Sequence, residues 1–74
     1  MNIEVRLFAT FRQGREKKQI LCVKEGTTIC EILQILNIPQ DEVALLLLNG
    51  FDGSVDRELK DSDVLSLFPP VGGG

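Results

Sequence analysis

Histidine, tryptophan and tyrosine are all absent from this chain of 74 residues. Without histidine, the chain has no Ser-His or Cys-His nucleophile pair, no histidine acid–base group and none of the common histidine metal sites. The GxxxxGK loop, the GxGxxG fingerprint and the GxSxG elbow, which mark phosphate-binding and hydrolase sites, are also missing. We therefore expect a protein that is not an enzyme by itself and that binds neither a metal nor a cofactor.

Cysteine is scarce, and its two copies, Cys22 and Cys30, lack the CxxC spacing. Both fall among apolar neighbours inside expected regular elements. This placement favours buried free thiols in a reducing compartment, and a bond between the two is the alternative.

Long apolar runs are lacking as well. The longest, residues 43–48, is far too short to cross a bilayer. No basic segment followed by an apolar core opens the chain, as it does in secreted proteins. We therefore expect a cytoplasmic protein that makes no contact with a membrane.

The net charge of −3 argues against nucleic acid as a partner, because phosphate binding needs clustered lysine and arginine side chains. One basic cluster does occur, interrupted by Glu16, and it consists of Arg12, Arg15, Lys17 and Lys18. A solvated loop between two strands explains this cluster, and a ligand site is the alternative.

Alternation and short apolar runs predict the strands. Ile3, Val5 and Leu7 alternate with more polar residues, which is typical of a strand with one buried face. Residues 19–23 predict a second strand, joined to the first as a hairpin, although both of its faces are apolar. Residues 43–48 predict a central strand, with a buried helix as the alternative. Residues 51–55 predict a short edge strand or a turn, and residues 64–68 predict the last strand.

The helix has the clearest signals. Thr28 and Glu31 have the spacing of a capping box, in which each side chain bonds a free backbone N–H group. One apolar stripe then follows at helical spacing, formed by Ile29, Ile32, Leu33 and Leu36. Asn37 suits the left-handed position after a helix, and Pro39 cannot continue it.

A chain this short supports one core only. The order hairpin, helix, strand, loop, strand places one main helix across one face of a mixed sheet of four to five strands. This α+β pattern resembles the β-grasp, or ubiquitin-like, fold. The resemblance implies that the first and last strands are parallel and central. We expect the domain to cover residues 1–70 and a flexible glycine tail to cover residues 71–74.

Two phenylalanines are expected on the sheet face away from the helix. If Ile3, Val5 and Leu7 face the helix, alternation turns Phe8 outward, and the same argument turns Phe68 outward. In a β-grasp sheet the two rings would lie side by side, beside the tail. Exposed neighbouring aromatics favour a partner interface. The alternative is burial under a loop, with Phe11 or Phe51 as the cover.

The chain ends on Val71-Gly72-Gly73-Gly74, after a stiff Pro69-Pro70 step. Glycine has no Cβ, so such an end can enter a channel too narrow for side chains. The carboxylate of Gly74 is then the expected reacting group, and an idle end is the alternative. Because a carboxylate resists attack, a separate enzyme would supply ATP and a sulfur donor, forming first an acyl adenylate and then a thiocarboxylate.

The ending LFPPVGGG, the opening IEVRLFATFR and residues 59–63 resemble the MoaD/ThiS family of sulfur carriers, and most of all its molybdopterin synthase small subunits. The resemblance implies an E1-like adenylating enzyme and a large synthase subunit as partners. It further implies that Gly74 carries the sulfur and that Gly72 and Gly73 permit entry to the partner. Docking is implied for Phe8, Phe68, Pro69, Pro70 and Val71. A thiamine-pathway carrier, a ubiquitin-like modifier of lysines and an idle interaction module remain as alternatives.

Overall fold

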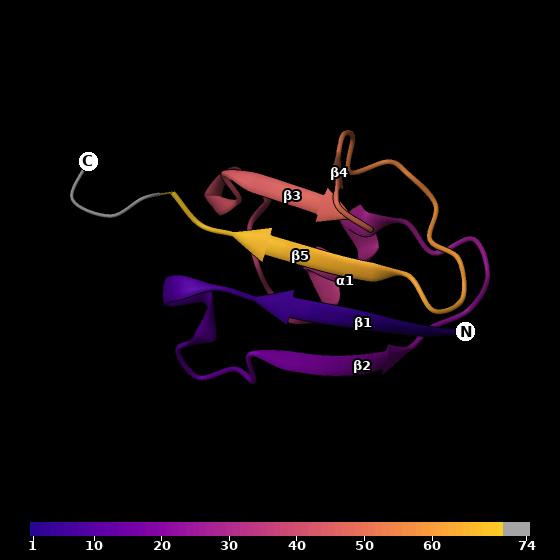
Figure 1. Ribbon diagram of the computed structural model, residues 1–74, viewed down its shortest axis with the longest axis horizontal. Coiled ribbons are helices and arrows are strands. Elements are labelled where there is room, and N and C mark those ends of the chain that lie inside the picture. The colour runs from indigo at the N-terminus through magenta and orange to yellow at the C-terminus, as the bar shows by residue number, and fades with distance from the viewer. Residues whose placement is uncertain (71–74) are drawn as a thin grey trace.

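One five-stranded mixed sheet and one α-helix make up the computed structural model, which describes residues 1–70 (Figure 1). Val71, Gly72, Gly73 and Gly74, with the predicted tail, lie outside the described residues. The elements in chain order are β1 (Asn2–Leu7), the 3-10 turn η1 (Ala9–Arg12), β2 (Lys18–Cys22), α1 (Ile29–Leu36), the 3-10 turn η2 (Gln40–Glu42), β3 (Leu45–Leu48), β4 (Phe51–Asp52) and β5 (Val64–Phe68).

The strands follow the spatial order β2-β1-β5-β3-β4, with the parallel pair β1 and β5 in the interior of the sheet. All other neighbours are antiparallel. The apolar run therefore forms an interior strand, as predicted, and its helical alternative is wrong. The two-residue strand β4 confirms the short edge strand expected from the sequence.

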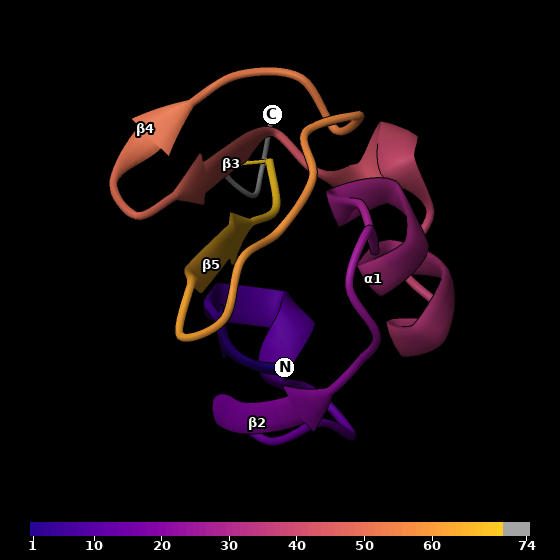
Figure 2. The same cartoon turned by 90° about the vertical axis from the view of Figure 1, so that its right-hand side faces the viewer.

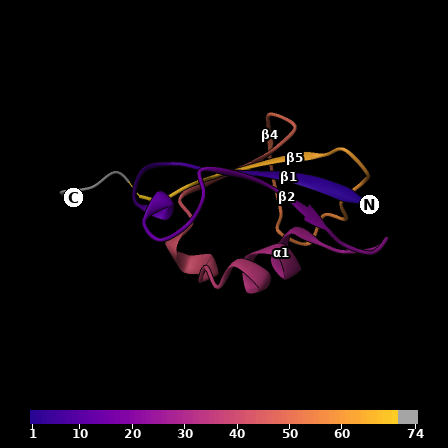
Figure 3. The same cartoon turned by 90° about the horizontal axis from the view of Figure 1, so that it is seen from below.

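The core lies between the sheet and α1, which crosses a single face (Figures 2 and 3). Side chains with no exposed surface come from β1, β5 and the helix, and they include Ile3, Val5, Leu7, Leu65, Leu67, Ile29 and Ile32. Alternation along the strands and the helical stripe thus predicted the inner faces correctly. Leu36, the last residue of the stripe, is half-buried at the edge of this cluster.

Both ends of α1 have the predicted chemistry. The backbone N–H of Glu31 donates to the Thr28 hydroxyl at 3.4 Å, and the Glu31 carboxylate accepts from the Thr28 N–H at 3.3 Å. Asn37 closes the helix in the left-handed conformation with φ 60°. A capped helix of only eight residues depends on such bonds and on packing, because short helices are marginal alone.

One prediction about the cysteines is wrong. Both thiols are free, as expected, but Cys22 is exposed and Cys30 is half-buried. For Cys22 the reason is the orientation of β2, because the sequence did not show which face of this strand packs against the helix. Gln19 and Leu21 face inward, so the alternation carries Cys22 to the outer face. Among residues 1–70, no helix is long and apolar enough to span a membrane.

We predict that Thr28→Ala lowers the free energy of unfolding by about 1 kcal/mol, because the first turn of α1 loses its side-chain acceptor. Urea denaturation monitored by circular dichroism measures this loss. Gln34→Ala is the matched control on the exposed face of the same helix, and it should change stability by less than about 0.5 kcal/mol. Equal losses in both variants would contradict a specific role for the cap.

Candidate functional site

Phe8 and Phe68 stack against each other where β1 and β5 end. Their ring centroids are 4.2 Å apart, and the ring planes differ by 13°. The register of the parallel pair explains this contact, since Leu7 is opposite Leu67 and the next residues on both strands turn to the outer face. The predicted pairing of the two rings is therefore confirmed.

The other two phenylalanines do not cover this pair. Phe11 belongs to the core cluster and is 7% exposed, whereas Phe51 is 74% exposed on the edge strand β4. Phe8 and Phe68 themselves are half-buried, and part of that burial is their mutual contact. The alternative in which Phe11 or Phe51 covers the rings is therefore wrong.

Arg12 holds the chain beside Phe8. Its Nε donates to the backbone carbonyl of Leu7 at 2.7 Å, and its guanidinium carbon lies 5.2 Å from the centroid of the Phe8 ring. Ala9, between them, adopts the left-handed φ of 52°, which lets the chain reverse directly after β1. From the sequence we expected Arg12 in a solvated loop, because no sequence pattern predicts the 3-10 turn at residues 9–12.

Leu45 extends the apolar surface onto the next strand. It is the register partner of Phe68, so both side chains project from the same face of the sheet, and it is 39% exposed. All four residues of β3 are leucine, which hides the alternation that would have revealed this position. We name the surface formed by Phe8, Phe68 and Leu45 the stacked-ring face.

The chain leaves the sheet beside the stacked-ring face. Pro69 is half-buried and Pro70 is exposed, and both border an open hollow on the side of η1 and η2. Arg15 also lines this hollow, but its guanidinium donates to the carbonyls of Leu36 and Asn37, each at 3.4 Å. The cation is therefore engaged in holding the loop after β1 against the end of α1.

The described part of the chain contains no group of three or more cysteine, aspartate or glutamate side chains placed to hold a metal ion. What the geometry offers is an apolar, partly exposed surface next to the point where the chain leaves its globular domain. Such an arrangement can bind a partner and present the residues that follow Pro70.

A sequence model of the ThiS family matches residues 5–74 of the chain. The chain belongs to the ThiS family. This finding confirms the resemblance to the MoaD/ThiS sulfur carriers drawn from the ending and the opening strand. The family comprises small ubiquitin-like carriers or modifiers, which are generally non-catalytic.

Similar proteins of two kinds are found for this ThiS-family chain. It is 34% identical over 94 residues to small archaeal modifier protein 3 of Haloferax volcanii, with both chains fully covered. It is 31% identical to a chain in the complex of subunits 1 and 2 of molybdopterin-converting factor from Helicobacter pylori 26695, with a TM-score of 0.67 and full coverage of both chains. A putative molybdopterin converting factor subunit 1 from Pyrococcus furiosus is 28% identical, with a TM-score of 0.77, 96% of this chain and 99% of that chain covered.

We predict that the two stacked rings stabilise the fold jointly. A double-mutant cycle of Phe8→Ala and Phe68→Ala should give a coupling energy of about 0.5–1.5 kcal/mol in urea denaturation, because stacked aromatic pairs contribute beyond their buried area. A cycle of Phe8→Ala with Phe51→Ala is the control, since Phe51 lies on the edge strand and is mostly exposed. Similar coupling in the two cycles would show that the stacking is not specific.

Proposed function

We propose that this protein is a sulfur carrier that acts as the small subunit of molybdopterin synthase, with the carboxylate of Gly74 as its reacting group. The stacked Phe8 and Phe68 pair, placed beside the exit of the chain, is the observation that carries one part of the proposal, namely that the domain docks on partner enzymes and presents its end to them. The similarity to a subunit of molybdopterin-converting factor and the Phe-Pro-Pro ending support the same role.

The proposed chemistry begins with two activation steps, both on partner enzymes. First, an oxygen of the Gly74 carboxylate attacks the α-phosphorus of ATP, so an acyl adenylate forms and pyrophosphate leaves. Then a sulfide-class donor attacks the acyl carbon and displaces AMP, which leaves a thiocarboxylate. Because a terminal carboxylate is ionised and unreactive at neutral pH, the E1-like enzyme must provide the activation. At the large synthase subunit, the thiocarboxylate sulfur would then replace a leaving group on a carbon of the bound precursor. Water would cleave the acyl–sulfur bond, so that the sulfur stays on the precursor and the Gly74 carboxylate is restored.

The contacts of the folded domain with a partner must offset the entropy that is lost when the tail is ordered. Fixing each residue of Val71, Gly72, Gly73 and Gly74 in a narrow channel costs roughly 1–2 kcal/mol. Glycines contribute no side chains to offset that cost. The stacked-ring face, with Pro69 and Pro70, offers the apolar and aromatic contacts that dominate binding energies at interfaces.

A second candidate is a ubiquitin-like modifier, which the 34% identity with a small archaeal modifier protein favours. The same adenylate would form on Gly74, but a lysine amine of a target protein would finally take the acyl group. The two roles share the domain, the tail and the activating enzyme. They differ only in the nucleophile that attacks the activated acyl carbon.

Intact-mass analysis of the protein from its native host distinguishes the roles. A mass gain of one oxygen-to-sulfur exchange at the terminus supports the carrier, and linkage to lysines of other proteins supports the modifier. Loss of molybdopterin on deletion of the gene assigns the carrier to the proposed pathway, whereas thiamine auxotrophy assigns it to the thiamine pathway. An unaltered protein in cells that make both cofactors would contradict the proposal.

We predict that deleting Gly74, or adding one alanine after it, abolishes cofactor synthesis and leaves the urea midpoint unchanged. The reacting carboxylate would be moved or lost, whereas the buried core runs from Ile3 to Leu67 and stays intact. Complementation of a deletion strain measures function. Full complementation by the extended variant would rule out the terminal carboxylate as the reacting group.

We predict that Phe68→Ala weakens binding to the E1-like enzyme by about 10-fold or more, a loss above 1.4 kcal/mol, as expected for an aromatic anchor. Binding is measured by calorimetry and corrected for the folded fraction at the same temperature. Phe51→Ala is the matched control, because that ring is exposed but distant in the sheet order. If Phe68→Ala lowered only stability, with affinity per folded molecule unchanged, the ring would serve the fold alone.

A further inference from the structure

A basic corner lies beside the stacked rings. A shallow hollow is lined by Phe8 and by four cationic residues, Arg6, Arg12, Lys17 and Lys18. Strand pairing fixes this arrangement, because Arg6 is the register partner of Lys18 and the N–H of Leu7 donates to the carbonyl of Lys17 at 2.8 Å. The lysines of the predicted solvated loop are therefore held next to Phe8.

The four cations differ in how far they are already engaged. Arg6 forms an ion pair with Glu4. Arg12 bonds the Leu7 carbonyl and stacks on the Phe8 ring. Lys17 and Lys18 are exposed, and no carboxylate within residues 1–70 forms an ion pair with either. The two ammonium groups are therefore the cations of this corner without a partner in residues 1–70, and the exposed Glu16 carboxylate beside Lys17 offsets part of their charge.

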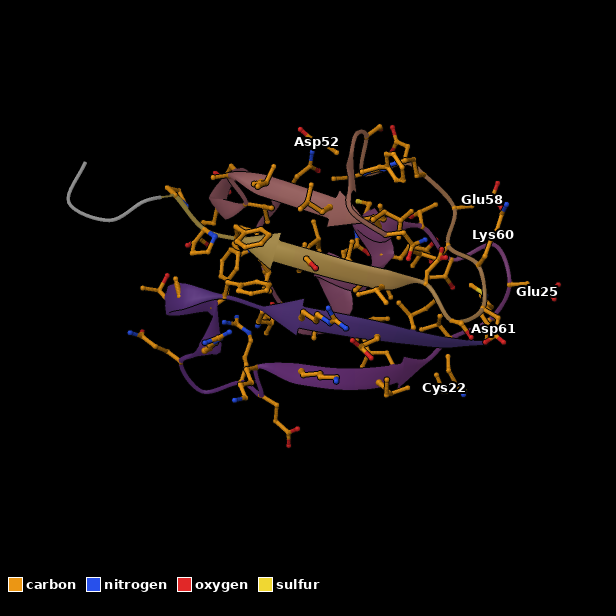
Figure 4. All side chains as sticks on the ribbon, in the orientation of Figure 1. Cys22, Glu25, Asp52, Glu58, Lys60 and Asp61 are labelled. Atoms are coloured by element: carbon orange, nitrogen blue, oxygen red, sulfur yellow. The ribbon has the colours of Figure 1, made fainter. Side chains whose placement is uncertain are left out.

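The opposite end of the molecule is acidic. Figure 4 shows Glu25, Glu58 and Asp61 around the loops at the end away from the chain exit, together with Lys60. The whole chain has 11 acidic and 8 basic residues, so the basic corner is a local exception to a net charge of −3. The basic corner is therefore a local positive patch beside Phe8, and Asp41 and Glu42 line the separate hollow beside Pro69 and Pro70.

We propose that the activating enzyme docks with carboxylate side chains opposite Lys17 and Lys18, around an apolar pocket that receives Phe8 and Phe68. This inference rests on the proposed function and names the chemistry of its partner. A protein surface fits better than nucleic acid or an anionic membrane, because the basic corner is small and the rest of the chain would be repelled by a polyanion. The apolar rings also need a pocket that a phosphate backbone lacks.

Charges at the border of an interface act mainly on the rate of association. They steer the partners over distances up to the Debye length, about 8 Å at physiological salt, and are screened at higher salt. The two lysines would therefore orient the approach of the carrier, while the rings set the lifetime of the complex.

The test uses the full-length protein and the purified E1-like enzyme of the same organism. The double variant Lys17→Glu/Lys18→Glu reverses both lysine charges of the basic corner and leaves Arg6 and Arg12 in place. The matched control, Lys24→Glu/Lys60→Glu, changes the net charge equally at the other end of the molecule. Lys60 lies in a loop at that end, and Lys24 is next to Val23, whose N–H donates to the carbonyl of the N-terminal Met1. Stopped-flow association rates are measured from low to high salt, and ATP–pyrophosphate exchange gives KM and kcat. Unfolding curves confirm that both variants fold.

At low salt, we expect the corner variant to associate at least about 10-fold more slowly than the control, with the gap closing as salt rises. Its KM in exchange should rise while kcat stays unchanged, because the reacting end is untouched. Equal effects in both double variants, or no salt dependence, would overturn the inference. Tighter binding of the wild type to duplex DNA than to the enzyme, lost in the corner variant, would replace it with a polyanion site.

The exchange assay separates this inference from the function on which it rests. If the wild-type protein supports no ATP–pyrophosphate exchange at any concentration, the proposed function and the inference both fail. If exchange is normal but the corner variant matches the control in KM and association rate, only the charged docking surface fails.

Discussion

The parallel pairing of β1 with β5 is the constraint on which the rest of the structure depends. Parallel neighbours end at the same edge of a sheet, so the residues that follow Leu7 and Leu67 meet there. The pleat then decides that these residues, Phe8 and Phe68, project from the face that the helix leaves uncovered. One pairing therefore places both the stacked rings and the exit of the chain at the same edge.

This arrangement divides the apolar side chains between folding and binding. The residues with no exposed surface lie on the inner face, between the sheet and α1. Phe8, Phe68 and Leu45 lie on the other face, where a partner can still gain by covering them. A domain of this size has a stability of only about 4–11 kcal/mol. Because the side chains of the inner face already form a buried core, the two outer rings are available to contact a partner.

The sequence predicted most of the fold because its signals were local and redundant. Thr28, Glu31 and Asn37 each mark a helix end by their own chemistry, and Ile3, Val5 and Leu7 mark one face by alternation. Prediction failed where a segment was apolar throughout or irregular. The two faces of β2 could not be told apart, so the exposure of Cys22 was missed. The contacts of Arg12 depend on the left-handed backbone of Ala9 and on a 3-10 turn, and no sequence pattern predicted either of them.

The geometry of the site favours neither sulfur transfer nor protein modification by itself, and chemistry explains why. Both routes begin with the same electrophile, an acyl adenylate, and they part only when sulfur or an amine attacks it. A domain that presents its end to foreign enzymes cannot choose between these nucleophiles through its fold. Because activation is common to both routes, the choice falls to the enzyme that supplies the nucleophile. Phe8, Phe68 and the neighbouring lysines, which we propose as the docking surface for the activating enzyme, therefore serve both routes alike.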